Sequence, residues 1–153
     1  TNRFFYCFST VEGTGYAPIL AGHMIREPFA PFAITGAGGP VVVQAFWQQH
    51  GPIRSLGYRF GSVAYSSDVN ALDDKAFEVL EGIEVWILDA LRYRAHPTHA
   101  NVETALQWIA RVKPKRAILT NLHIDLDYEK LRTELPDGVE PAYDGMTFSV
   151  GLP

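Results

Sequence analysis

The second half of the chain alternates short apolar runs with amphipathic segments, and this alternation restricts the possible folds more than any other feature of the sequence. Residues 83–89 and 116–121 are apolar runs of the length expected for buried strands. Between them, residues 101–112 place apolar side chains at helical spacing, and Pro114 follows directly after this segment. Strands that alternate with helices in this way predict an α/β protein with parallel strands.

The remaining elements are predicted from the same signals. Further helices are expected at residues 73–83 and 128–135, and a last strand at residues 146–152. The first third of the chain is rich in glycine and proline, and its short apolar runs predict strands at residues 18–25, 31–36 and 40–49, followed by a hairpin over residues 56–68. The glycine-rich GAGGP stretch precedes a β run rather than a helix, so it predicts a turn and not a phosphate-binding loop.

Composition narrows the class of protein. With 153 residues, of which 47% are hydrophobic, the chain can form one globular domain. The net charge of −4 provides no general attraction for nucleic acid, although it does not exclude a nucleic acid as substrate. The single cysteine, Cys7, cannot form an intrachain disulfide, which favours a reducing, cytoplasmic location. No apolar run approaches the ~18 residues of a membrane span, so no membrane association is expected.

Polar side chains that can bind metals follow several of the expected strands. His50, Asp68, Asp89 and His123 stand at or just after four of them. In α/β sheets, functional groups collect beyond the carboxyl ends of the strands. Imidazole nitrogens and carboxylate oxygens are suitable ligands for divalent transition metals, so these residues together predict a metal site.

Each of these residues also has a purely structural interpretation. His50 precedes Gly51 and is a possible turn residue, whereas Asp68 is a possible helix N-cap. Asp89 could orient the loop that follows it, and a lone histidine such as His123 is more often structural than a ligand. The loop after Asp89 carries two more histidines, His96 and His99, which are either catalytic groups or members of a polar loop.

The ordered motifs FWQQHG, SLGYRFG, VAYSSDV, LDALRYRAHPTH, RAILTNLHIDLDY and AYDGM resemble the later part of metallo-hydrolases of the metallo-β-lactamase superfamily. The most similar branch is the phosphodiesterase of the carbon–phosphorus lyase pathway and its bacterial relatives. This resemblance implies an αβ/βα sandwich that binds two divalent metal ions, zinc or manganese. It also implies a metal-dependent hydrolase in which a hydroxide bridging the ions attacks a small-molecule phosphodiester or a related ester.

The resemblance assigns roles to individual residues. His50 corresponds to a ligand of one ion, and Asp68 to the carboxylate that bridges both ions. His99 corresponds to the proton donor, with His96 beside it as a phosphate contact.

Three further assignments follow from the resemblance. The family's last histidine ligand falls at Asn121 in this chain, and His123 is the residue that could replace it, because residues two apart in an extended segment face the same side. Asp89 and Asp144 are then expected to orient ligands by hydrogen bonding.

The family's His-x-His-x-Asp-His signature, which supplies four ligands, does not occur in these 153 residues. We therefore expect residues 1–153 to form the C-terminal part of a single metallo-hydrolase domain whose N-terminal part is missing from this chain. Such a chain is expected to bind metal weakly or not at all, to be inactive by itself and to form homo-oligomers through apolar surface left bare. The alternative is a non-catalytic, self-associating α/β fragment or interaction domain.

Overall fold

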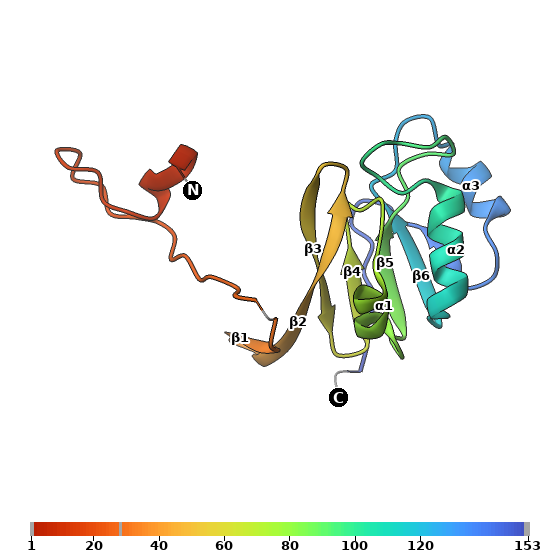
Figure 1. The fold of residues 1–153 in the computed structure, drawn as a ribbon, viewed down its shortest axis with the longest axis horizontal. Coiled ribbons are helices and arrows are strands. Elements are labelled where there is room, and N and C mark those ends of the chain that lie inside the picture. The colour runs from red at the N-terminus through yellow and green to blue at the C-terminus, as the bar shows by residue number, and fades with distance from the viewer. Residues whose placement is uncertain (1, 28, 152–153) are drawn as a thin grey trace.

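The computed structural model describes residues 2–27 and 29–151 and contains one seven-stranded mixed sheet (Figure 1). The strands lie side by side in sequence order: β1 (Phe32–Gly36), β2 (Gly39–His50), β3 (Ile53–Phe60), β4 (Val63–Ser66), β5 (Val85–Asp89), β6 (Arg116–Thr120) and β7 (Val139–Pro141). The helices between the later strands are α1 (Asp74–Leu80), α2 (Val102–Val112) and α3 (Tyr128–Glu134).

The sheet changes character at β4. Strands β1 to β4 are joined by tight turns and pair antiparallel, whereas β4, β5, β6 and β7 pair in parallel and are connected through the three helices. Parallel crossovers are almost always right-handed, and here each successive crossover moves to the next strand in the same direction. Helices in such a series lie on one face of the sheet.

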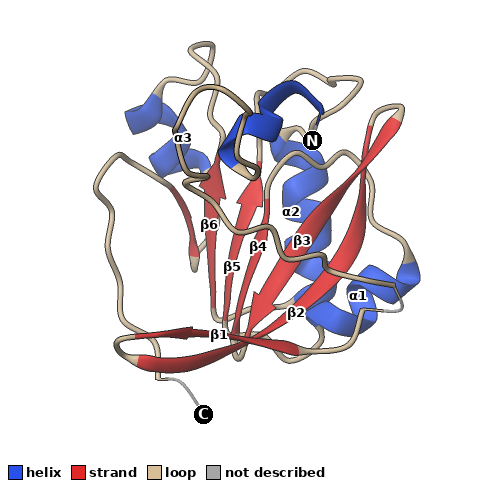
Figure 2. Cartoon of the chain, turned by 90° about the vertical axis from the view of Figure 1, so that its left-hand side faces the viewer, coloured by secondary structure: helices blue, strands red, loops and turns tan. Residues whose placement is uncertain are grey.

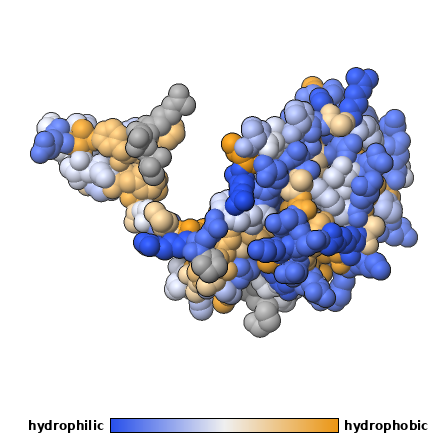
Figure 3. Space-filling model, viewed as in Figure 1, coloured by the Kyte–Doolittle hydropathy of each residue, from blue (hydrophilic) through white to orange (hydrophobic). Residues whose placement is uncertain are grey.

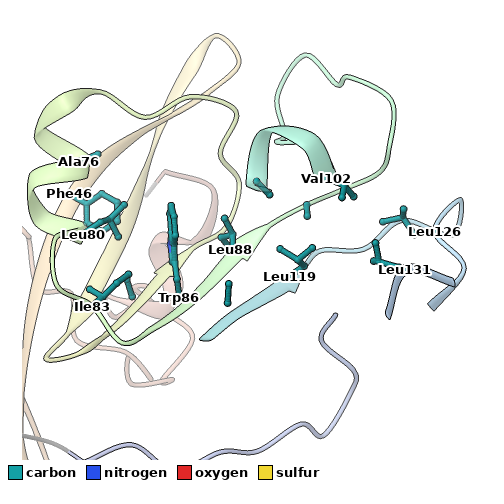
Figure 4. Packing of buried hydrophobic residues seen from close by; sticks show 14 residues of the cluster. Phe46, Ala76, Leu80, Ile83, Trp86, Leu88, Val102, Leu119, Leu126 and Leu131 are labelled. Atoms are coloured by element: carbon teal, nitrogen blue, oxygen red, sulfur yellow. The ribbon is translucent and has the colours of Figure 1, made fainter. Parts of the chain in front are cut away.

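The hydrophobic core lies between the sheet and these helices. Figures 1 and 2 show α1 and α2 against one face of the strands. Trp86 of β5 is fully buried at the centre of this layer, close to Leu80 of α1 and Leu88 of β5 (Figure 4). Its indole Nε1 donates to Ser66 Oγ at 3.0 Å, which satisfies the one polar group of this side chain.

Within the described residues no helix lies on the opposite face of the sheet, and the N-terminal arm, residues 2–27 and 29–30, extends away from it (Figures 1 and 2). The arm begins with a short 3-10 helix, η1 (Asn2–Cys7), which contacts its own downstream segment through bonds from the amides of Ile19 and Leu20 to Cys7 O. Large apolar side chains stay exposed along it, including Tyr16 and Met24. Figure 3 shows hydrophobic surface on the arm.

Most of the elements expected from the sequence are present, including the expected hairpin and all three helices. Two expected strands are wrong. Residues 18–25 form no strand, because within the described chain the arm has no neighbouring strand edge to pair with. Residues 146–151 also form no strand. The ring of Phe148 in this segment instead lies under the guanidinium of Arg116, with 5.1 Å between the ring centroid and Arg116 Cζ.

The seventh strand is instead β7, with the sequence Val-Glu-Pro, which pairs with β6. A strand this short and polar has no sequence signal, and its position at the sheet edge tolerates Pro141, which has no amide hydrogen to donate. Among the described helices, none is both long and apolar enough to span a bilayer.

Candidate metal and catalytic site

One edge of the sheet collects the polar strand ends. Strands β4, β5 and β6 run in the same direction, so their carboxyl ends meet at one edge. Strand β2 is antiparallel to β3, which is antiparallel to β4, so β2 also ends at this edge. The arrangement places His50, Asp68, Asp89 and Asn121 along the same border, where the loop of residues 90–101 crosses over them.

His50 is the last residue of β2, and its imidazole is oriented by the loop opposite. Its Nδ1 lies 2.7 Å from the carbonyl oxygen of Thr98. A carbonyl oxygen only accepts hydrogen bonds, so Nδ1 carries the hydrogen and Nε2 is left with a free lone pair. This is the tautomer that a metal-binding histidine with an outer hydrogen-bond partner adopts.

His99 is oriented in the same way by a carboxylate. Its Nδ1 lies 2.6 Å from Asp89 Oδ2, and Asp89 is completely buried. The other ring nitrogen, Nε2, therefore points toward the candidate site, 3.9 Å from Asp68 Oδ1. The rings of His50 and His99 meet edge to face, with 4.8 Å between their centroids.

Asp68 follows β4 in a backbone conformation that is uncommon for any residue other than glycine, with a φ of 54°. The helix-cap interpretation of this residue is wrong: α1 begins at Asp74, and its N-cap is Asp73. The carboxylate of Asp68 is instead 58% exposed and turned toward His99. Strained backbone at an exposed carboxylate is typical of functional sites.

The structure brings together one potential ligand atom each from His50, Asp68 and His99, all within 4.8 Å of one another. Zn²⁺ binds nitrogen and oxygen ligands at about 2.0–2.2 Å, so two ligands of one ion lie at most about 4 Å apart. The distance between His99 Nε2 and Asp68 Oδ1 meets this limit. Two imidazoles and one exposed carboxylate, which are ligand types that divalent transition metals accept, therefore converge at this place.

Asn70 ties together the loops that carry these side chains. Its Oδ1 accepts from the Gly51 amide, and its Nδ2 donates to Pro97 O, both at 3.0 Å. Gly51 turns the chain between β2 and β3 with a φ of +60°, and an added Cβ would come within 2.5 Å of Thr98 Cγ2. The turn after His50 and the loop before His99 are thus in direct contact.

Asp89 is the buried anchor of the site. Besides His99 it accepts from the Val69 amide at 3.2 Å and from Asn121 Nδ2 at 3.3 Å. Burial raises the pKa of the Asp89 carboxyl above its ordinary value, and the hydrogen bonds from His99 and Val69 partly offset that effect. Burial of the Asp89 carboxylate is therefore unfavourable by itself, and this carboxylate orients the imidazole of His99.

His96 lies on the outer side of His99, with 5.2 Å between the ring centroids. Its Nδ1 accepts from the Thr98 amide at 3.3 Å, so in the neutral ring the hydrogen is on Nε2, which can donate to an anion. Desolvation lowers the pKa of His96, and the charge of nearby Arg92 lowers it further.

His123 and Asp144 lie outside the group of three. The amide of His123 donates to Leu91 O, and its Nδ1 lies 3.2 Å from both the amide nitrogen and a carboxylate oxygen of Asp125. Asp144 is exposed in a turn, and in the part of the chain that the structure describes no hydrogen bond or ion pair joins it to the other site residues.

Sequence reasoning did not identify Asn70 and Thr98 as parts of the site. Both act through contacts with distant segments, and no local pattern marks such a role. Asn121 was noted only as the position of the family's last histidine. Its Nδ2 lies 3.3 Å from Asp89 Oδ1 and 3.2 Å from His99 Nδ1, so its side chain contacts the pair that orients the site.

The chain is also similar to several known proteins. Residues 2–124 match the family model described as the beta-lactamase superfamily domain. The chain is similar to the crystal structure of a diphosphatase from the PhnP family, with 33% identity and a TM-score of 0.73 over 78% of the chain and 47% of that protein. It also shares the fold of zinc-bound PqqB from Methylobacterium extorquens, at 14% identity and a TM-score of 0.57, over 78% of the chain and 53% of that protein.

A curated relative carries a different activity in its name. The chain is 28% identical over 123 residues to an octanoyltransferase of Porphyromonas gingivalis, which corresponds to 78% of the chain but only 24% of that protein. The chain thus spans about a quarter of this relative and about half of the diphosphatase. The matched family model covers most of the chain, and the mixed sheet with its helices is the α/β arrangement of the same family. The chain belongs to the metallo-β-lactamase superfamily.

Proposed function

We propose that these residues form part of the active site of a metal-dependent phosphodiester hydrolase. The observation that carries the proposal is the convergence of His50, Asp68 and His99, with both imidazoles oriented by a hydrogen bond at Nδ1. In this proposal His50 and Asp68 would hold the metal, with Asp68 as the carboxylate ligand. Zinc and manganese both suit these ligands.

Divalent ions bound there would polarise the phosphoryl oxygens and lower the pKa of the attacking water. The protein residues supply the rest of the chemistry. Asp89 holds the Nδ1 hydrogen of His99, so that Nε2 of His99 can carry the proton given to the leaving alkoxide. The negative charge of Asp89 stabilises the imidazolium before transfer, and His96 Nε2 donates to a phosphate oxygen.

The number of ligands supports the proposal that this chain provides the C-terminal part of a larger metallo-hydrolase domain. His50 and Asp68, even with His123 added, are too few protein ligands for two ions. We therefore propose that a preceding segment with the His-x-His-x-Asp-His signature supplies the others, and that residues 1–153 alone bind metal weakly and turn over no substrate. A cytoplasmic location fits the free thiol of Cys7.

Zinc titration of the chain by calorimetry tests the proposed ligands. We expect weak binding that His50→Ala and Asp68→Asn each reduce at least tenfold. His23→Ala is the matched control, because His23 is exposed on the N-terminal arm and far along the chain from the site. Equal affinity in the wild type and both site variants would refute the proposed ligands.

Two further variants separate the remaining roles. His99→Ala is expected to leave the zinc affinity within about threefold and to abolish turnover in the complete domain; a tenfold loss of affinity would make His99 a ligand instead. His123→Ala tests the ligand role expected from the resemblance: a tenfold loss of affinity supports that role, whereas unchanged affinity assigns His123 to the loop that it shares with Asp125.

The substrate class is tested with the complete domain. We expect zinc- or manganese-dependent cleavage of a generic aryl phosphodiester and little activity on an aryl octanoate ester. The opposite preference would favour acyl chemistry, as in the name of the curated relative.

A further inference from the structure

Two side chains of strands β2 and β3 donate hydrogen bonds to the strained backbone around Asp68. Ser55 Oγ donates to the carbonyl oxygen of Asp68 at 2.7 Å, and Gln48 Nε2 donates to the carbonyl oxygen of Ser67 at 3.0 Å. Gln48 and Ser55 are register partners on β2 and β3, and their side chains lie 3.4 Å apart, from Nε2 to Oγ. These bonds fix the carbonyl groups of Ser67 and Asp68, which lie on either side of the backbone bond with the φ of 54°.

Gln48 is an unusual residue for its position. It is only 2% exposed, and its Oε1 has no hydrogen-bond partner among the described residues. A buried, unsatisfied carbonyl oxygen is destabilising, and an apolar side chain of the same shape would avoid that cost.

The surrounding sheet is adapted to this glutamine. Gly57 lies on β3 beside it, and a Cβ at that position would come within 2.7 Å of Gln48 Oε1 and 2.3 Å of Phe46 Cζ. Gly57 is the register partner of Phe46, so the chain keeps a glycine next to both this ring and a buried amide that stability alone does not favour. The amide contributes instead through its bond to Ser67, next to Asp68.

We infer that Gln48 and Ser55 are positioning residues that hold the Asp68 carboxylate in its orientation toward His99. The inference rests on the proposed function of Asp68 as a metal ligand. Without the two bonds the backbone at Asp68 would relax to a negative φ, because that region is favoured for aspartate. The carboxylate would then turn away from the position 3.9 Å from His99 Nε2.

The test compares Gln48→Met and Ser55→Ala with Gln44→Met. Methionine has nearly the shape of glutamine but cannot donate to Ser67. Gln44 is the matched control, because it lies on the same strand and its Nε2 also donates to backbone carbonyls, those of Phe29 and Ala45, away from the site. Ser55→Thr keeps the hydroxyl and should retain the behaviour of the wild type.

We expect Gln48→Met and Ser55→Ala to weaken zinc binding tenfold or more, while their melting temperatures stay within a few degrees of that of Gln44→Met. NMR of the metal-free protein supplies the second readout. In the wild type and in Gln44→Met, the backbone chemical shifts and the HN–Hα coupling of Asp68 should be typical of a positive φ. In Gln48→Met and Ser55→Ala, both should change to values typical of a negative φ.

The outcomes separate this inference from the proposed function. A wild-type chain that binds no zinc would argue against the proposed metal site, whereas the NMR signature of Asp68 would still test the positioning role. Unchanged Asp68 signals in both Gln48→Met and Ser55→Ala, or zinc affinity within threefold of wild type with those signals moved, would overturn the positioning role.

Discussion

The buried carboxylate of Asp89 accepts a hydrogen bond from His99 Nδ1 at 2.6 Å, at the edge where four strand ends meet. This pair connects the hydrophobic core to the candidate site, because Asp89 is the last residue of the buried strand β5. The chain bears the cost of burying a carboxyl group at the one place where it fixes the tautomer of an imidazole.

Asp89→Asn separates this role from stability. An asparagine can donate to His99 Nδ1 and so favours the wrong tautomer, and we expect a 10–100-fold loss of turnover in the complete domain. The pKa of Asp89 is raised by burial, so folding favours its protonated form. The wild type therefore loses stability as pH rises from below the ordinary aspartate pKa of about 3.9 through the raised value.

Because D89N carries no charge to bury, we expect its melting temperature at neutral pH to equal or exceed that of the wild type. Calorimetric melting curves from acidic to neutral pH, together with turnover, check both expectations. Asp144→Asn is the control and should change neither the melting temperature nor the turnover. A marked drop in melting temperature with unchanged turnover would mean that Asp89 serves the fold alone.

Asn70 should determine how tightly the histidine loop closes over the site. Asn70→Asp keeps the acceptor for the Gly51 amide but places an oxygen against Pro97 O, so it detaches the loop selectively. A lost hydrogen bond is worth about 1 kcal/mol, which predicts about fivefold faster local opening. Amide hydrogen exchange at Ala100, whose N–H bonds to Val69 O at 2.6 Å, measures this opening.

The amide of Ala117, which bonds to Gly138 O on the far side of β6, serves as the internal reference for N70D. Its exchange rate should stay unchanged. Equal acceleration at Ala100 and Ala117 would indicate global destabilisation and would count against a local role for Asn70.

Tyr93 ties the outer part of the same loop to α3. Its hydroxyl donates to Glu134 Oε2 at 2.6 Å, and this bond raises the pKa of Tyr93 to about 12. Folding thus favours the protonated phenol, so the contribution to stability is complete below a pH of about 10 and is lost between about 10 and 12. Ultraviolet titration should show one tyrosine with this high pKa, absent in Tyr93→Phe and retained in Tyr16→Phe.

The chain should associate through its N-terminal arm and the helix-free face of the sheet. The arm exposes Ile19 and Met24, each at 80%, and such apolar surface favours burial against another molecule. We expect light scattering to give a mass above the 17.0 kDa of one chain. Ile19→Asp with Met24→Asp should shift the protein toward the monomer, whereas Ile124→Asp, at an even more exposed position outside the arm, should not.

A monomeric wild type at high concentration would contradict this expectation. It would show that the arm covers its own apolar side chains in solution.

Which residues lie at strand ends was predictable from local sequence, because strand length and position follow from the apolar runs. His50 and Asp68 were expected at one edge for this reason, and the structure places them there. The helices were equally predictable, since each one has its own apolar periodicity and an N-cap: Asp73, Asn101 and Asp127.

Which histidine completes the group was decided only by the path of the loops. His99 and His123 both lie in loops at the same edge, yet His99 meets Asp68 because Asp89 and Asn70 fold its loop inward. His123 instead lies next to Asp125. The strand β7 and the unpaired N-terminal arm were also decided by the tertiary structure, because strand pairing depends on which sheet edge is free in three dimensions. The sequence by itself determined the helices, the central strands and the chemistry at their ends; tertiary contacts between distant segments decided the edge strand and which of those groups meet.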